Sequence, residues 1–147
     1  MKVRSRYGWI VILLFLISGC GSDTRLKDYQ PKNEQEKEIK NLLVEYVTAR
    51  NNYDVQKMAS YLSDDARIGF LDGRTFSKSE FASTFKARDL EAWGKLDCFD
   101  PDIKIKDNFA EIKMKFKESL LNTGVFRFKM NRQNNRWVIT EFNADRA

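Results

Sequence analysis

The feature that most constrains the fold is a change in the spacing of apolar residues along the chain. Between residues 39 and 62 they recur every three or four positions, as on one face of a helix. From Trp93 onward they recur at every second position, as in strands that have one buried face. The clearest alternation of apolar and charged residues covers residues 110–117. Helices followed by a run of strands predict an α+β domain.

Three helices are expected, and each begins at a polar capping residue. The expected N-caps are Asn33, Asp54 and Ser77. A glutamate stands three residues after the first and the third of these, which is the spacing of a capping box. The first helix carries an apolar stripe over residues 39–47, the second is expected to end at residues 63–65, and the third to extend to Leu90.

The remaining pattern predicts strands that are separated by tight turns. A strand over residues 66–71 should return through residues 75–76 after the Asp72–Gly73 turn. Pro101 interrupts the next strand, which indicates a bulge or an edge position. Further strands of an antiparallel meander are expected over residues 103–105, 110–116, 126–130 and 136–142.

The first twenty residues have the organisation of a secretion signal. Basic residues precede an apolar run over residues 9–17, which is too short to span a bilayer. The sequence Ile-Ser-Gly-Cys at residues 17–20 resembles the bacterial lipobox, in which the cysteine sulfur receives a diacylglycerol. We expect a signal peptide over residues 1–19, a lipidated Cys20 with a flexible tether over residues 20–33, and a folded domain over residues 34–147.

The expected location is the bacterial cell envelope. Several acyl chains on one cysteine anchor a protein stably to a membrane. The residue after Cys20 is Gly21 and not aspartate. By resemblance to the sorting of Gram-negative lipoproteins, this implies the outer membrane, facing the periplasm, if the source is Gram-negative.

Composition excludes several classes of function. The formal net charge is +5, but three of the 26 basic residues and none of the 21 acidic ones lie in the expected signal peptide. The mature chain is therefore close to neutral, and we expect no nucleic-acid partner. The chain has no histidine, which excludes Ser-His and Cys-His nucleophiles and His-ligated zinc. Asp97, Asp100 and Asp102 lack the spacing of a calcium loop, so no metal or cofactor is expected.

The order of elements resembles the nuclear transport factor 2-like superfamily, which includes ketosteroid isomerases and polyketide-cyclase-like (SnoaL-like) proteins. The residues that carry the resemblance lie at positions 42–46, 54–66, 73, 81 and 136–139, within a stretch of roughly residues 34–143. The resemblance implies a cone in which three N-terminal helices pack on a curved antiparallel sheet and close a pocket. The resemblance predicts the fold but not the activity, because many unrelated activities share this scaffold.

The catalytic residues of the isomerases are only partly matched. Their oxyanion-binding tyrosine corresponds to Tyr46, but the position of their catalytic aspartate falls on Phe70, whose ring cannot accept a proton. A tyrosine on an apolar helical stripe is more often part of the core, and we favour core packing over catalysis for Tyr46. Asp72 is assigned to the hairpin turn, and Glu118 and Glu141 remain as candidate carboxylates. The expected lining of the pocket is aromatic: Tyr46, Phe70, Trp93, Phe126 and Phe128.

A row of basic residues alternates with the apolar ones and should share the outer face of the sheet. The residues of this basic face are Lys104, Lys106, Lys113, Lys115, Lys117, Arg127 and Lys129. Many relatives dimerise through this face with apolar side chains, whereas here like charges would stack, so we expect a monomer or a weak dimer. The face either attracts anionic lipid or an acidic partner, or is a solvated surface that resists aggregation.

Three functions remain open at this point. The first is a non-catalytic, membrane-anchored domain that binds a small apolar ligand or part of a partner protein in its pocket. The second is a structural or assembly lipoprotein of the envelope that acts through the basic face. The third is an isomerase- or cyclase-like enzyme, which requires a carboxylate in the pocket.

Overall fold

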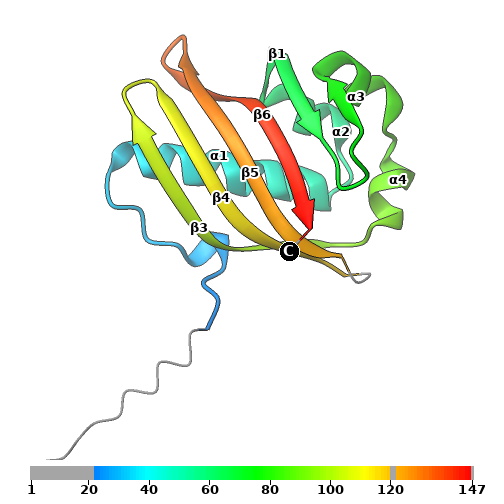
Figure 1. Ribbon diagram of the computed structural model, residues 1–147, viewed down its shortest axis with the longest axis horizontal. Coiled ribbons are helices and arrows are strands. Elements are labelled where there is room, and N and C mark those ends of the chain that lie inside the picture. The colour runs from blue at the N-terminus through cyan, green and yellow to red at the C-terminus, as the bar shows by residue number, and fades with distance from the viewer. Residues whose placement is uncertain (1–21, 120–121, 147) are drawn as a thin grey trace, which may run out of the picture.

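The computed structural model describes residues 22–119 and 122–146 (Figure 1). The predicted signal peptide and the predicted lipid attachment site, Cys20, lie outside the described residues. The described elements, in chain order, are the 3-10 helix η1 (Leu26–Asp28), α1 (Glu34–Asn51), α2 (Val55–Ser60), β1 (Leu62–Gly69), β2 (Thr75–Ser77), α3 (Lys78–Thr84), α4 (Ala87–Ala92), β3 (Leu96–Lys106), β4 (Phe109–Glu118), β5 (Thr123–Gln133) and β6 (Arg136–Arg146).

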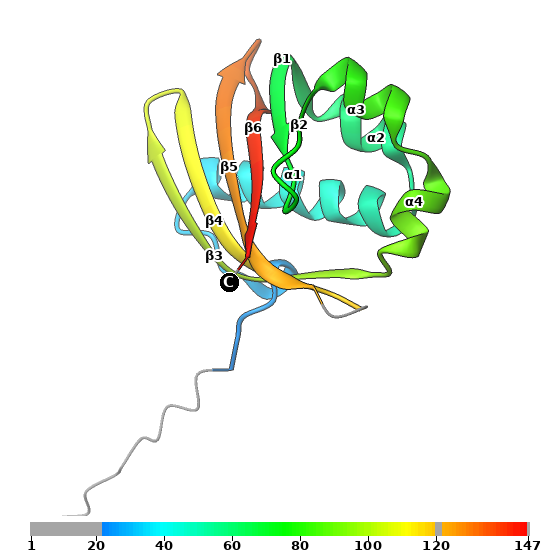
Figure 2. The same cartoon turned by 45° about the vertical axis from the view of Figure 1, so that its right-hand side comes forward.

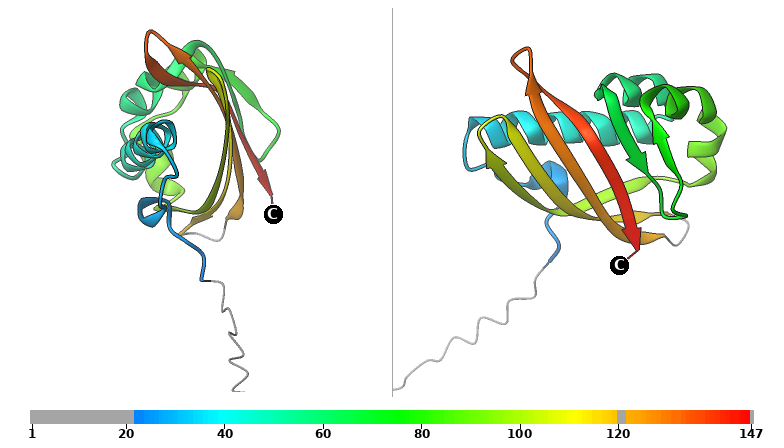
Figure 3. Two further views of the ribbon diagram at one scale, coloured as in Figure 1. Left: turned by 90° about the vertical axis from the view of Figure 1, so that its left-hand side faces the viewer. Right: turned by 45° about the horizontal axis from the view of Figure 1, so that its top comes forward.

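The strands form one six-stranded sheet in the order β2-β1-β6-β5-β4-β3. Neighbouring strands are antiparallel except β1 and β6, which run parallel. The sheet curves, and the helices cover its concave face, as Figure 2 and the left view of Figure 3 show. The predicted α+β class with a curved sheet is confirmed; the parallel β1–β6 pair is the feature that the expected meander lacked.

The core lies between α1 and the concave face of the sheet. Every second residue of β4 is buried from Ala110 to Phe116, as the alternation predicted. Tyr46 of α1 packs edge-on against Phe128 of β5, with ring centroids 6.0 Å apart. Ile39 and Leu43 of the same helix are fully buried. The apolar stripe of the first predicted helix therefore faces the sheet.

The predicted caps form, with one difference. Ser77 and Glu80 make both hydrogen bonds of a capping box at the start of α3. The side chain of Asn33 accepts a hydrogen bond from the backbone N–H of Glu36 (2.9 Å), as expected of an N-cap. The Glu36 carboxylate does not return the bond to Asn33, because it accepts from the N–H of Lys32 (2.8 Å) and the hydroxyl of Tyr29 (2.9 Å).

Two predicted helix ends are wrong. The second helix stops at Ser60, and residues 63–65, expected to end it, belong to β1. The cause is a distant partner: the backbone N–H of Ile139 donates to the carbonyl of Tyr61, and Leu62 pairs with Ile139. The third predicted helix is two helices, because Phe85 has an extended backbone (φ −83°, ψ 139°).

The folded domain begins at an earlier residue than the sequence predicted. Arg25 forms a β-bridge with Phe99 of β3, and Leu26 is 4% exposed in the hydrophobic core. Residues 24–32 therefore belong to the folded domain, whereas a flexible tether was predicted over residues 20–33. The bulge expected at Pro101 is present, as a register shift between residues 99 and 102 of β3.

Candidate functional site

A cavity of about 300 Å³ opens between α1, α4, the β1–β2 hairpin and the ends of β4, β5 and β6. This volume is at the lower end of the range typical of ligand sites. Phe70, which directly follows β1, stacks against Phe85 with ring centroids 4.9 Å apart, and its ring is 5.8 Å from that of Trp93. The rings of Phe70 and Trp93 line the cavity and give it an apolar wall that suits a hydrophobic ligand.

Four of the five predicted pocket residues line the cavity, namely Tyr46, Phe70, Trp93 and Phe126. Phe128 does not line it. Its side chain points inward from β5 as predicted, but it is 1% exposed and lies behind the ring of Tyr46. Phe128 is therefore a core residue that supports the cavity wall, a distinction that alternation along one strand does not make.

The polar part of the wall is a buried ion pair. Nη2 of Arg50 lies 3.2 Å from Oε1 of Glu118, and the two side chains are 4% and 12% exposed. The Nη1 atom of Arg50 donates to the carbonyl of Leu90 (3.1 Å), and the Asn122 amide donates to Oε2 of Glu118 (3.3 Å). The Arg50 guanidinium also lies 5.6 Å from the centroid of the Trp93 ring. Both charges are thereby compensated inside the pocket.

The sequence contained a signal for both members of this pair. Arg50 follows Tyr46 by four positions, which places it on the same buried face of α1. Glu118 is the next position in the inward phase of β4 after Phe116. Glu118 was one of the two candidate carboxylates; the other, Glu141, lies on the outer face of the sheet, where it pairs with Lys129 at 2.9 Å.

The hydroxyl of Tyr46 is available to a ligand. Tyr46 is 4% exposed and lines the cavity, and no hydrogen bond joins its hydroxyl to another residue in the described part of the chain. Burial raises the pKa of Tyr46 well above its ordinary value, so the hydroxyl remains a neutral donor. It can donate a hydrogen bond to a carbonyl or ether oxygen of a bound molecule.

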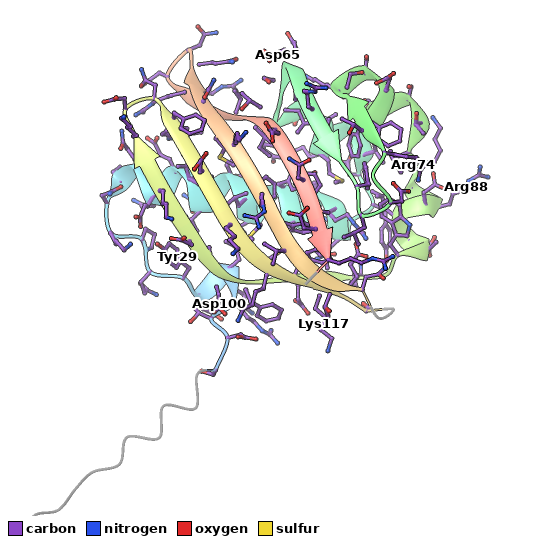
Figure 4. The ribbon with its side chains drawn as sticks, in the orientation of Figure 1. Tyr29, Asp65, Arg74, Arg88, Asp100 and Lys117 are labelled. Atoms are coloured by element: carbon purple, nitrogen blue, oxygen red, sulfur yellow. The ribbon has the colours of Figure 1, made fainter. Side chains whose placement is uncertain are left out.

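The β1–β2 hairpin forms part of the mouth of the cavity. The predicted Asp72–Gly73 turn is confirmed, since Gly73 has φ +82° and the backbone N–H of Arg74 donates to Asp72. The guanidinium of Arg74, labelled in Figure 4, lies 2.7 Å from the carboxylate of the same aspartate. Hydrogen bonds from the backbone and side chain of Arg74 lower the pKa of Asp72, so its carboxylate is ionised at neutral pH. The mouth is therefore polar and the interior aromatic.

Cys98, the cysteine within the described residues, is buried and does not line the cavity. Cys98 is 5% exposed, and burial raises the pKa of its thiol. The thiolate is the nucleophile in alkylation, so a buried thiol with a raised pKa reacts slowly. Alkylation of Cys98 by iodoacetamide should be roughly 100-fold slower in the folded protein than in protein unfolded by guanidinium. Mass spectrometry of the peptide that contains Cys98 measures both rates. Equal rates in the two conditions would show that the residue is accessible.

The predicted basic face points outward, but it is not purely basic. Across the strands, Glu111 lies opposite both Lys104 and Lys129, and Lys117 lies opposite Asp97. On the β4–β5 pair, Lys113 and Arg127 are like charges in register. Acidic residues therefore separate the basic ones at several positions of this face. The mixture of charges is typical of a solvated sheet surface.

Neither a metal site nor a spanning helix is found among the described residues. They contain no group of three or more acidic or cysteine side chains that could hold a metal ion. None of the helices over residues 22–119 and 122–146 has the length and apolarity needed to cross a membrane.

Comparison with known proteins identifies the fold. No protein-family model and no curated protein matches the sequence. Among solved structures, an NTF2-like protein from Cytophaga hutchinsonii matches with a TM-score of 0.65 at 17% identity, over 78% of this chain and 99% of that one. An NTF-2 like protein of unknown function from Shewanella oneidensis matches with a TM-score of 0.62 at 21% identity, over 76% and 98%.

A third match adds the alternative name of the fold. An NTF2-like protein with a cystatin-like fold from Novosphingobium aromaticivorans matches with a TM-score of 0.63 at 14% identity, over 77% of this chain and 82% of that one. The resemblance to the nuclear transport factor 2-like superfamily is thus confirmed at the level of fold. At these identities it carries no activity with it.

Proposed function

We propose that this chain is a lipoprotein of the bacterial envelope, anchored through Cys20, whose NTF2-like domain binds a small, largely apolar molecule without converting it. The observation that carries the proposal is the cavity of about 300 Å³ with aromatic walls. Such a cavity binds an apolar body by burial, while a few polar groups orient it. Tyr46 supplies the polar contact, so an apolar ligand with one acceptor oxygen fits best.

The state of Glu118 supports binding rather than catalysis. A general base has to be placed so that it can reach the proton that it removes. Here the Arg50 guanidinium donates to Oε1 and the Asn122 amide donates to Oε2, which fixes the carboxylate against the wall of the cavity. The carboxylate thus serves to hold Arg50 in the pocket wall. This reasoning favours a carrier or sensor over an isomerase- or cyclase-like enzyme.

Filling the cavity should abolish binding. Ala144 lines the cavity at the end of β6. An Ala144→Phe substitution places a ring inside it, so the affinity for the apolar probe 1-anilinonaphthalene-8-sulfonate should fall at least about tenfold, or about 1.4 kcal/mol. Energy transfer from Trp93 to the probe, with Trp137 replaced by phenylalanine, measures the binding.

The control for this experiment is Ala92→Phe, which adds the same ring at an exposed position of α4. It should leave the affinity unchanged. Equal affinities of the two variants would contradict binding in this cavity.

Mass spectrometry of a bound physiological ligand distinguishes binding from catalysis. Recovery of a converted product that disappears in the Tyr46→Phe variant would support an enzyme.

A further inference from the structure

The N-terminal segment of the described chain, residues 23–29, is fixed to the edge strand β3; we call it the strut. The backbone N–H of Thr24 donates to Oδ1 of Asp100 (2.7 Å), and the backbone N–H of Asp100 donates to the carbonyl of Thr24 (2.8 Å). Asp100 adopts the left-handed region (φ 50°), which aspartate tolerates better than most residues. The next residue, Arg25, continues the pairing as a bridge to Phe99.

Charged groups reinforce this end of the strut. The Lys115 ammonium lies 3.0 Å from the carboxylate of Asp23 and 2.7 Å from that of Asp100. The hydrogen bond from Lys115, followed by that from Thr24, lowers the pKa of Asp100, so its carboxylate is ionised at neutral pH. Lys115 thus joins the strut to β4 as well as β3.

The other end of the strut is fixed to α1. The hydroxyl of Tyr29 donates to Glu36 (2.9 Å), and Lys40 donates to the carbonyl of Tyr29 (2.7 Å). Burial and the hydrogen bond to Glu36 raise the pKa of Tyr29 to about 12, so the hydroxyl keeps its proton. With Leu26 in the core, the strut is attached to the domain along its whole length.

The strut leaves little free chain before the expected acylation site. Asp23 is three positions after Cys20. Three residues span at most about 11 Å even when fully extended. A tether over residues 20–33 would have allowed the domain to move several times farther from the lipid.

The strut begins at one side of the domain, where the ends of several strands lie; we call this side an edge of the domain. Figures 1 and 4 place the start of the described chain, Asp100, Lys117 and the C-terminal end of β6 along this edge, and the β5–β6 turn at the opposite one. The exposed residues Asn122 and Arg146, which line the mouth of the cavity, belong to the strand ends on the same side. The short free chain and the position of the strut therefore act together.

We infer that the strut holds the domain on the surface of the bilayer with the edge of Asp100 and Lys117 facing the lipid headgroups. This rests on the acylation of Cys20 proposed above. The partner of this edge is the bilayer surface itself. The domain does not swing freely on its anchor, and the mouth of the cavity stays beside the headgroups.

The test compares the two opposite edges of the domain, which lie at opposite ends of the strands. A fluorophore is attached to Lys117→Cys or to Asn134→Cys, each in a Cys98→Ala background of the acylated protein purified after expression of the full chain. Because Lys117 pairs with Thr123 and Asn134 follows the other end of β5, the labels are separated by about 35 Å. The protein is reconstituted in vesicles of phosphatidylethanolamine and phosphatidylglycerol that contain a lipid with a spin label on its headgroup.

Contact quenching should be at least roughly threefold greater at position 117 than at position 134, because the quencher acts over much less than the length of a strand. Removing the attachments with Asp100→Gly and Lys115→Ala together should reduce the difference in quenching between the two positions. The matched control is Asp107→Gly with Lys113→Ala, since Asp107 also has a positive φ (53°) but forms no hydrogen bond or ion pair with the strut in the described part of the chain. The control should preserve the difference.

The outcomes separate this inference from the proposed anchoring. If mass spectrometry shows an acylated Cys20 and the two positions are quenched equally, the oriented attachment is overturned and the lipoprotein proposal stands. If Cys20 carries no lipid, the anchoring is overturned, and the orientation with it. Greater quenching at position 134 would mean that the opposite edge faces the bilayer.

Discussion

An Arg50→Met variant should lose about 3–5 kcal/mol of its free energy of unfolding, because the substitution leaves the buried carboxylate of Glu118 without its cation. The guanidinium is 3.2 Å from that carboxylate, and its side chain is 4% exposed. The variant also removes the donor to the carbonyl of Leu90. Urea denaturation followed by circular dichroism measures the change.

The double variant Arg50→Met, Glu118→Leu is the control for this prediction. Replacing both members of a buried ion pair by apolar residues is often close to neutral, so the double variant should recover most of the lost stability. If Arg50→Met alone costs less than about 1 kcal/mol, the pair is hydrated rather than buried. The pocket would then present a charged group to its ligand, which would contradict a largely apolar molecule.

The second large effect is expected for Phe128→Ala, which should cost about 3–5 kcal/mol of unfolding free energy. Phe128 is 1% exposed, and its ring contacts those of Tyr46 and Phe142 at centroid distances of 6.0 and 4.9 Å. Removing it leaves a void behind the cavity wall. The affinity for the apolar probe should fall as well, because Tyr46 loses the ring that holds it in place.

Phe109→Ala is the matched control, because it truncates the same residue type on β4 where the side chain is 38% exposed. Its effect on stability should lie within about 0.5 kcal/mol. Similar losses in the two variants, measured by thermal and urea unfolding, would contradict the assignment of Phe128 to the core. A loss of probe affinity in Phe109→Ala would place the binding site elsewhere.

Local sequence signals predicted much of this fold. The alternation along residues 110–117 identified the buried face of β4, because successive side chains of a strand point to opposite faces. The Asp72–Gly73 turn and the Ser77–Glu80 capping box depend on neighbouring residues and were predicted correctly. Where a signal depended on the distant chain, as at residues 63–65, the prediction failed.

The candidate site was predicted only in part, because its residues come from segments that are far apart in the sequence. Four of the five aromatic residues expected in the pocket line the cavity. Strand periodicity could not separate Phe126, which lines it, from Phe128, which does not. Both residues point inward from β5, and they differ in their tertiary packing, since the ring of Phe128 packs against Tyr46 of α1. Arg50 was missed, because a charged residue on a buried stripe reveals its role only with its partner.

By itself, the sequence determined the α+β class, most caps and turns, and which faces of β4 and β5 are buried. These features follow from backbone preferences and side-chain periods that act within a few residues. Only the tertiary structure decided the parallel pairing of β1 with β6, the Arg50–Glu118 pair and the strut. These contacts join residues that are 68 positions apart in the ion pair and 76 in the Thr24–Asp100 bond. Such pairs have no local period, because distant segments of the chain must pack together before their atoms meet.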